Sequence, residues 1–348
     1  MKKKVFAGIM AVLLGMSLVA CGSAGSSDSA GNAENTENAE SSDNNQADSA
    51  EAATIRVGSI KALGTVTPYV SEELGYFEEA GINVEVTDFS DGTALAEAFA
   101  AGELDIGLFG IAPAATWFSK GVDMQVVAGA NGGGHVVLVK KGEGIDSVAD
   151  LKGKIIAEPG LGSVTDTLLR DHILKNAGLD AEKDVTSQPG MKPADMATSL
   201  YATGEVDAII SWEPFVTQAQ QQYGDDVQIL YDSALEIQAE TGSDSFYPVN
   251  VVAASGDYIA NHADILQKFV DSYKKTVDYI NTDGKANELI AGILEQDEQT
   301  IADSRTRVDF NYNIDITGLD TTLEWALNCG YLDSIPDDAE FYNNSFVE

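Results

Sequence analysis

Short apolar strands alternate with glycine-terminated helices along most of this 348-residue chain, and no other feature constrains its fold as strongly. The stretches TIRVGSI at 54–60 and NVEVTDF at 83–89 have the β-branched, alternating pattern of strands. A helix between them is expected to begin at Pro68, to run to Glu79 and to stop at Gly81. This alternation favours βαβ units and therefore an α/β fold with parallel strands.

The same pattern continues to about residue 254, and the chain from Tyr258 onward is expected to be mostly helical. The segments 101–107 and 203–209 resemble each other, since each has a helix-ending glycine, then Glu, an apolar residue and Asp, then a buried strand. Each strand leads to a helix opened by proline, at Pro113 and Pro214. The similarity of these two segments favours two similar lobes, although Gly-Glu-x-Asp is also simply a sequence that ends helices well. Further expected strands are 104–109, 124–128, 135–140, 154–157, 185–187, 208–211 and 249–254.

The first 53 residues have the pattern of a targeting segment and a tether. Residues 1–21 combine three lysines, an apolar stretch too short for a membrane span, and small residues before Cys21, which resembles a bacterial lipobox. We expect cleavage before Cys21 and a lipid on its sulfur; a plain signal peptide is the alternative. Residues 22–53 lack aromatic and basic residues and are predicted to be a disordered tether. The protein would then sit at the cell membrane, lipid-anchored on its extracytoplasmic face.

Charge and motif content exclude several classes of function. The 20 basic and 56 acidic residues give a net charge of −36, which disfavours binding to nucleic acid. Two cysteines cannot form a disulfide scaffold or a zinc cluster. His135, His172 and His262 are scattered, and no common catalytic motif occurs. The segment GLGSVT at 160–165 lacks the third glycine of a dinucleotide fingerprint. We therefore expect neither an enzyme nor a bound cofactor or metal.

Ligands of open α/β sheets bind outside the carboxyl ends of the strands, where helix N-termini offer free N–H groups. Those ends are rich in Gly, Ser, Thr and Pro here. Asn131 and the three following glycines are expected to be a floppy turn. Trp212 could flank a ligand or cover a core, and Glu213 could bind a ligand amine or cap a helix. The candidate binding residues are Leu63, Gly64, Thr65, Ser90, Asp91, Gly92, Gly110, Ile111, Ala112, Asn131, Gly132, Ser163, Val164, Thr165, Met191, Lys192, Trp212, Glu213 and Tyr247.

An ordered set of stretches resembles the substrate-binding proteins of transporters for nitrate, sulfonate, taurine and thiamine-precursor pyrimidines. The matching stretches are LGYF at 74–77 with AGI at 80–82 and Val84, 98–106, DLKGK at 150–154, Gly162-Ser163, AGL at 177–179, and 204–207 leading to WEPF at 212–215. The resemblance spans nearly all of residues 54–332. It implies a periplasmic-binding-protein type 2 fold, in which each lobe has a mixed, mostly parallel sheet flanked by helices, and two crossover strands join the lobes.

The resemblance also implies the lobe boundaries and the role. Lobe 1 would be 54–138 plus 247–348 and lobe 2 would be 139–246, with crossovers at 135–140 and 248–254. A monomer would capture a small solute between the lobes and deliver it to an ABC permease and its ATPase by hinge closure.

The sequence departs from sulfonate-binding relatives in one place, because Val164, Thr165 and Asp166 stand where some of them have a histidine. No arginine lies in the candidate loops, so a dianion is disfavoured, whereas a sulfonate, a zwitterion or a heterocycle remains open. A lipid-anchored enzyme and a sensory module are the alternatives from other classes.

Overall fold

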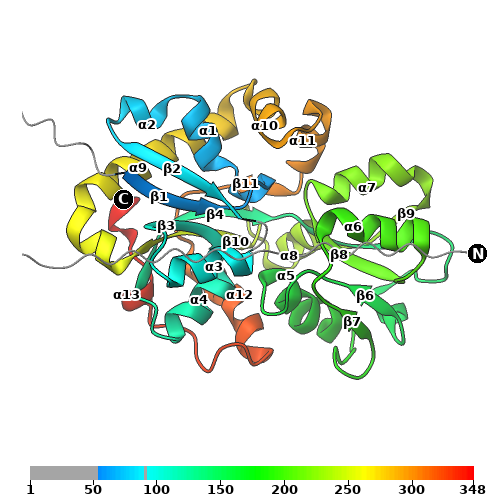
Figure 1. Cartoon of the computed structure of the whole chain (residues 1–348). Coiled ribbons are helices and arrows are strands. Elements are labelled where there is room, and N and C mark those ends of the chain that lie inside the picture. Colours follow the sequence, from blue (N-terminus) through cyan, green and yellow to red (C-terminus); the bar gives the residue numbers. More distant parts are fainter. Residues whose placement is uncertain (1–53, 90–91) are drawn as a thin grey trace, which may run out of the picture. The chain divides into compact units, whose positions relative to one another are not determined.

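Two β-sheets organise the computed structural model, which describes residues 54–89 and 92–348 as parts of one compact unit (Figure 1). The first sheet has the strand order β11-β4-β10-β3-β1-β2, and the second has the order β7-β6-β8-β5-β9. The first is built from β1 (Thr54–Ser59), β2 (Asn83–Asp88), β3 (Ile106–Gly110), β4 (Met124–Gly133), β10 (Pro248–Ser255) and β11 (Val308–Phe310). The second is built from β5 (His135–Lys140), β6 (Ile155–Ala157), β7 (Thr186–Gln188), β8 (Ala208–Trp212) and β9 (Val227–Asp232).

Helices connect and flank these strands. Those of the first part of the chain are α1 (Thr67–Glu73), α2 (Tyr76–Glu79), α3 (Gly92–Ala100) and α4 (Ile111–Ser119), with the short 3₁₀ turn η1 (Leu63–Thr65). Around the second sheet lie α5 (Val164–Thr167) with its π-helical continuation η3 (Leu168–Leu174), α6 (Pro193–Ala197) with its π-helical continuation η4 (Thr198–Thr203), α7 (Phe215–Tyr223), α8 (Ser233–Thr241), and the 3₁₀ turns η2 (Val148–Leu151) and η5 (Gly224–Asp226). The rest are α9 (Gly256–Thr282), α10 (Ala286–Leu294), α11 (Glu298–Ser304), α12 (Ile316–Asn328), α13 (Asp338–Phe341) and η6 (Asn344–Phe346).

The predicted α/β class with two mixed sheets is confirmed. Among the described residues, four strand pairings are parallel and five are antiparallel, so parallel pairing is not in the majority. The antiparallel partners are β10 and β11 in the first sheet and β5 and β9 in the second. Strands β5 and β10 are the ones that follow a crossing of the chain from one sheet to the other.

Alternation along the central strands divides the apolar core between the two faces of the first sheet. In β10, Val252 and Ala254 join one cluster with Leu108 of β3, while Val251 and Ala253 join the other. This second cluster continues into the second sheet through residues such as Val137 of β5. A third cluster, including Leu138, covers the remaining face of that sheet. The cluster that contains Val251 and Val137 therefore runs through both sheets.

The chain crosses between the sheets at Gly134 and returns between Asp232 and Pro248. Gly133 and Gly134 have φ angles of 71° and 91°, which side chains disfavour, so glycine permits the turn. Strand β5 lies wholly in the second sheet, because His135 pairs with Trp212. Residues 135–138 thus pair with the second sheet, although the predicted boundary assigns them to lobe 1.

Several local expectations need correction. Asn131, Gly132 and Gly133 are not a floppy turn but the end of β4, where they pair with β11. The helix expected from Pro68 to Glu79 is broken at Gly75, whose φ is 69°. The structure also contains strand β9, helix α8 and strand β11, which the sequence pattern did not predict. These elements have polar residues or only a very short apolar run.

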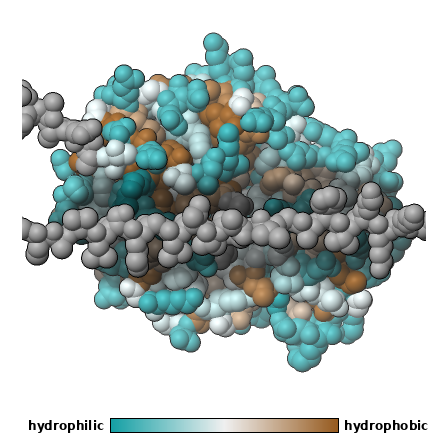
Figure 2. Space-filling view, in the orientation of Figure 1, coloured by the Kyte–Doolittle hydropathy of each residue, from teal (hydrophilic) through white to brown (hydrophobic). Residues whose placement is uncertain are grey.

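The predicted signal peptide, tether and lipidated Cys21 lie outside the described residues, as do Ser90 and Asp91. Within 54–89 and 92–348, no helix has both the length and the apolar character needed to cross a membrane. Figure 2 shows hydrophilic residues over most of the visible face, with hydrophobic residues in smaller groups between them. This surface fits the strongly acidic composition.

Candidate functional site

Two asparagines and a glycine come together beside the carboxyl ends of the first sheet. The Nδ2 of Asn250 in β10 donates a 2.7 Å hydrogen bond to Oδ1 of Asn131 in β4. Gly64 of η1 faces this pair so closely that a Cβ there would lie 2.6 Å from the same Oδ1 atom. The absence of a side chain at Gly64 therefore lets the backbone approach the asparagines.

The two sheets meet where Gly110 faces Val164. Gly110 ends β3 and caps α4, and a Cβ on it would lie 3.2 Å from Cγ2 of Val164 in α5 and 3.8 Å from Oδ1 of Asn250. Gly162, just before α5, faces the ring of Tyr331 in the same manner, with 3.4 Å to its Cδ1. Loops of the first sheet thus contact the α5 loop of the second sheet at two places.

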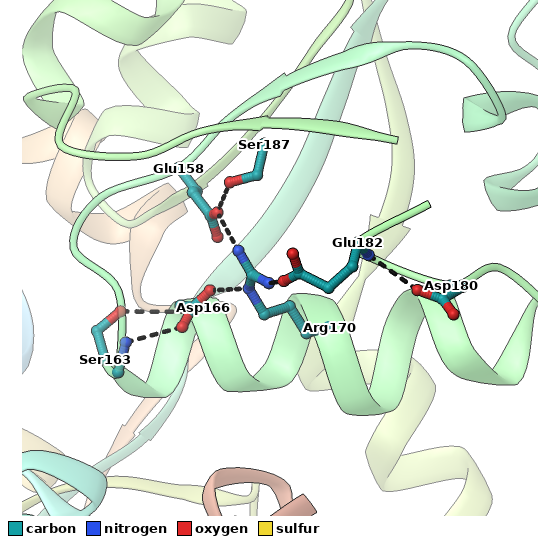
Figure 3. Close-up of polar contacts among 8 residues, drawn as sticks. Glu158, Ser163, Asp166, Arg170, Asp180, Glu182 and Ser187 are labelled. Carbon is teal, nitrogen blue, oxygen red and sulfur yellow. Dashed lines mark hydrogen bonds and ion pairs between the residues drawn. The ribbon is translucent and has the colours of Figure 1, made fainter. Parts of the chain in front are cut away.

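The α5 loop is held by its own polar groups (Figure 3). Ser163 caps α5 by accepting a 3.2 Å hydrogen bond from the N–H of Asp166. The Oδ2 of Asp166 accepts a 2.7 Å hydrogen bond from the N–H of Gly162, and its Oδ1 is paired with Arg170. These bonds fix the conformation of Gly162, Ser163 and Val164, the residues that meet the other sheet.

One carboxylate from β11 holds both crossings of the chain. Asp309 accepts hydrogen bonds from the N–H of Gly132 at 2.9 Å and from the N–H of Phe246 at 3.0 Å. A Cβ on Gly132 would lie 2.9 Å from the carbonyl oxygens of Phe246 and Tyr247, so the two crossings are in close contact. Burial raises the pKa of Asp309, whereas its two backbone hydrogen bonds act to lower it.

A buried chain of hydrogen bonds joins His135, Tyr247 and Ser233. Ser233 donates to the carbonyl oxygen of His135 at 2.6 Å, and its oxygen lies 2.9 Å from the Tyr247 hydroxyl. Because each hydroxyl has one hydrogen, Tyr247 then donates to Ser233, and His135 donates from Nδ1 to Tyr247 across 2.6 Å. Burial lowers the pKa of His135 to about 4 and raises that of Tyr247. The histidine is therefore neutral at pH 7.

Trp212 and Glu213 have different environments. Trp212 is half-buried, with its ring edge-to-face against both His135 and Phe215. The side chain of Glu213 is fully buried, where it accepts a 3.0 Å hydrogen bond from the N–H of Thr217 in α7 and pairs with Arg307 at 3.0 Å. Glu213 thus has a helix-capping contact, one of the two roles weighed from the sequence.

The other candidate residues lie at varying distances from this cluster. Leu63, Thr65, Ile111, Ala112 and Thr165 are buried. Gly92 begins α3. Met191 packs against the core cluster of the second sheet, and Lys192 is exposed at the start of α6. The residues that the contacts bring together are Gly64, Gly110, Asn131 and Val164, with Gly162 and Tyr331 beside them.

Asn250, Arg307 and Asp309 were missed by the sequence reasoning. A signal existed for Asn250, because it is the lone amide in the otherwise apolar stretch 248–254. No pattern singled out Arg307 and Asp309, since their role depends on where β11 pairs in the sheet.

Two surface hollows lie away from the cluster. One of about 460 Å³ is lined by residues of α1, α9 and α10, among them Leu74 and Tyr279. The other, of about 360 Å³, lies between α7 and the end of α11 and is lined by residues including Thr217 and Arg307. Neither is lined by a candidate residue.

The charged groups limit what the cluster can bind. The four arginines of the sequence all have protein partners: Arg56 binds Asp105, Arg170 three carboxylates, Arg305 Asn287, and Arg307 Glu213 and Asp232. In residues 54–89 and 92–348 no group of three or more His, Cys, Asp or Glu side chains could hold a metal ion. Amides, hydroxyls and backbone N–H groups are therefore the means of recognition that the cluster offers.

Two sheets whose loops meet at one cluster define the class of two-lobed proteins with the periplasmic-binding-protein fold. The structure of the periplasmic aliphatic sulphonate binding protein SsuA from Escherichia coli has a TM-score of 0.68 at 21% identity, covering 84% of this chain and 92% of that one. The periplasmic nitrate-binding protein NrtA from Synechocystis PCC 6803 has a TM-score of 0.70 at 13% identity, covering 85% and 88%. At these identities the likeness establishes the fold.

The model of the NMT1-like family matches residues 48–294, and the chain belongs to this family. The "Putative binding protein BAB2_1146" of Brucella abortus is 32% identical over 180 residues, which are 51% of this chain and 54% of that protein. This match spans about half the length of that relative. The "Putative aliphatic sulfonates-binding protein" of Bacillus subtilis is 26% identical over 277 residues, 73% of this chain and 81% of that protein. The resemblance drawn from the sequence motifs is confirmed, and these relatives are named as binding proteins rather than enzymes.

Proposed function

We propose that the protein is an extracytoplasmic solute-binding lipoprotein of an ABC importer. It captures one small organic anion or zwitterion, such as an aliphatic sulfonate or taurine, between its lobes and delivers it to a permease by hinge closure. The Bacillus subtilis relative named for binding aliphatic sulfonates supports this class of solute. No chemistry is performed on the solute.

The observation that carries the proposal is the contact of loops from two sheets around Gly110. Gly110 faces both Val164 of the second sheet and Asn250 of the first, and Asn250 in turn bonds Asn131. A solute held there would touch both lobes, which is the condition for a solute to drive closure. The contact between Gly110 and Val164 corresponds to the closed arrangement in this proposal.

A pyrimidine or another heterocycle is the second candidate solute. All four arginines are held by protein partners, so an amide pair and backbone N–H groups would do the recognition. Amides donate and accept equally well, and they suit the ring nitrogens and exocyclic groups of a heterocycle.

Isothermal titration calorimetry tests the proposal with taurine, ethanesulfonate, nitrate and an aminopyrimidine in turn. We expect one solute to bind with one-to-one stoichiometry and to be recovered unchanged. Binding should raise the melting temperature, since a hundredfold excess over Kd stabilises the folded state by about 2.7 kcal/mol. Conversion of a solute into a product would instead favour the lipid-anchored enzyme.

A further inference from the structure

A buried pair of carboxylates lies beneath the α5 loop (Figure 3). Glu158 follows β6 and Asp166 belongs to α5, and the side chains of both are fully shielded from solvent. Arg170 of η3 is the cation beside them, with Nε on Asp166 and Nη2 at 3.4 Å from Oε1 of Glu158. Its Nη1 binds a third carboxylate, the exposed Glu182.

The charges of this cluster do not balance when every carboxyl is ionised. One guanidinium then faces two buried carboxylates and one exposed carboxylate, and two like charges in a dry site repel strongly. The Oε1 atom of Glu158 accepts from the hydroxyl of Ser187 in β7 as well as from Arg170. The Oε2 atom is buried and has no hydrogen-bond partner. A proton on Oε2 would remove one charge and supply a donor toward Asp166.

Asp166 connects this pair to the opposite lobe. Its carboxylate holds the N–H of Gly162, and the ring of Tyr331 lies against Gly162. Burial first, and then the nearby Asp166 carboxylate, raise the pKa of Tyr331. A carboxylate has about four lone-pair sites, so it can accept from Arg170, Gly162, Tyr331 and a protonated Glu158 together.

We propose that Glu158 is a positioning residue that shares a proton with Asp166, and that this proton favours the closed arrangement in which Tyr331 reaches Asp166. The inference rests on the hinge closure of the proposed function. It concerns the conformation of the α5 loop, and it does not depend on which solute binds.

Titration of the groups around Glu158 gives the direction of the effect. Burial first, and then the charge of Asp166, raise the pKa of Glu158 to about 7. Asp166 and Arg170 face it from α5 and η3, Glu182 acts through Arg170, and β7 contributes only the hydroxyl of Ser187. After α12, Tyr331 and Cys329 approach Asp166, and burial raises the pKa of both.

Opening would expose this pair to water. Burial is the first cause of the raised pKa of Glu158, so the Glu158 carboxyl would ionise more easily in the open arrangement. Closure therefore takes up a proton, and the closed fraction should fall as the pH rises through about 7. A difference of about one pKa unit between the two arrangements would change the ratio of closed to open molecules about tenfold.

Distance measurement by double electron–electron resonance tests the inference without any solute. Spin labels are placed at the exposed Glu103, just before β3 of the first sheet, and Asp225, just before β9 of the second, in the full chain with Cys21→Ser and Cys329→Ser. We expect the closed distance to lose population between about pH 6 and about pH 8. Glu158→Gln, which mimics the protonated acid, should keep the closed population constant over this range.

Two variants separate the proton from the general charge of the cluster. Glu182→Gln removes the exposed carboxylate from the same Arg170 and should retain the pH response. Tyr331→Ala removes the ring that lies against Gly162 and so hydrates the pair in both arrangements. It should abolish the pH response of the distance, and it serves if Glu158→Gln does not fold. A wild-type pH response in Glu158→Gln, or a Glu158 carboxyl that titrates below about pH 5, would overturn the inference.

Two outcomes of the distance measurement separate this inference from the proposed function. A solute such as taurine that shortens the distance equally at every pH would support hinge closure and overturn the role of Glu158. A distance that no solute in the calorimetric panel changes would overturn hinge closure itself.

Discussion

The Nη1 atom of Arg307, which directly precedes β11, lies 3.0 Å from Oε1 of Glu213 at the end of β8, so this ion pair ties the first sheet to the second. The Nε atom of the same guanidinium lies 2.6 Å from Oδ2 of Asp232, at the end of β9. The Arg307 side chain is 15% exposed, and those of Glu213 and Asp232 are 0% and 9% exposed. One arginine is thus the shared ion-pair partner of two buried carboxylates beside the crossings of the chain.

Arg307→Ala should destabilise the folded body strongly. Its loss leaves Glu213 and Asp232 as uncompensated buried charges, which costs about 3–5 kcal/mol. Urea unfolding at neutral pH measures the change. The matched control is Lys275→Ala, because Lys275 pairs with Glu79 at the surface, where such a pair contributes about 0–1 kcal/mol. Equal losses of unfolding free energy in Arg307→Ala and Lys275→Ala would contradict this role of Arg307.

Asp309→Asn should loosen the two crossings. The amide can accept from only one of the N–H groups of Gly132 and Phe246, and its NH₂ group then faces the other. An unsatisfied buried donor costs about 1–3 kcal/mol. Hydrogen exchange should show faster exchange at the amides of Gly132 and Phe246 than in the wild type. Unchanged hydrogen-exchange protection of Gly132 and Phe246 would contradict the role of Asp309 in holding the two crossings together.

Gly110→Ala should weaken solute binding without unfolding the protein. Gly110 has an ordinary φ of −59°, but the new methyl group would lie 3.2 Å from Cγ2 of Val164 and would oppose the contact between the lobes. Calorimetry with the solute identified by the screen measures the Kd. Gly292→Ala in α10 is the control, since it meets no atom within 4 Å and should leave Kd unchanged. If Gly110→Ala binds as tightly as the wild type, the solute site lies elsewhere.

His135→Gln should change how stability depends on pH. Burial holds the pKa of His135 at about 4, against an ordinary value of 6.5, so the unfolded chain takes up the proton first as the pH falls. The wild type should lose on the order of 3 kcal/mol from this group between about pH 6.5 and about pH 4. Urea unfolding across this range should show that acidification lowers the free energy of unfolding more in the wild type than in His135→Gln.

Glu158→Gln provides the control of opposite sign for that experiment. The raised pKa of Glu158 gives stability that is present at low pH and is lost as the pH rises through about 7. This contribution changes between about pH 4.5 and about pH 7, so Glu158→Gln should lose more stability than the wild type on acidification through this range. Identical profiles in all three proteins would contradict both assignments.

Cys21→Ala should release the protein from membranes. Lipid chains on the Cys21 sulfur would bind the bilayer with about 0.8 kcal/mol per buried CH₂ group. Fractionation of cells that express the full chain measures the distribution between membrane and soluble material. Ser23→Ala, two residues along the chain, is the control and should remain with the membranes. Membrane partition of Cys21→Ala equal to that of the wild type would refute the lipid anchor.

The fold class and most strand positions could be predicted from the order of the amino acids. Strands such as β1 and β10 are rich in β-branched and small residues, and helices end at glycines such as Gly204, whose φ is 66°. These signals are local, because they depend on backbone preference and on period-two burial. The loops at the carboxyl ends of the strands followed from the same pattern, and four predicted residues, Gly64, Gly110, Asn131 and Val164, do lie in one cluster.

Which polar residues come into contact depends on the three-dimensional fold. The three-residue strand β11 has no periodicity of its own, yet it pairs with β4 and thereby brings Asp309 to both crossings. Glu158 and Asp166 are eight positions apart in an acidic chain, and nothing in their spacing indicates that they share one arginine in a dry interior. The energies of buried charges depend on burial and on partners, which the fold sets and the local sequence does not.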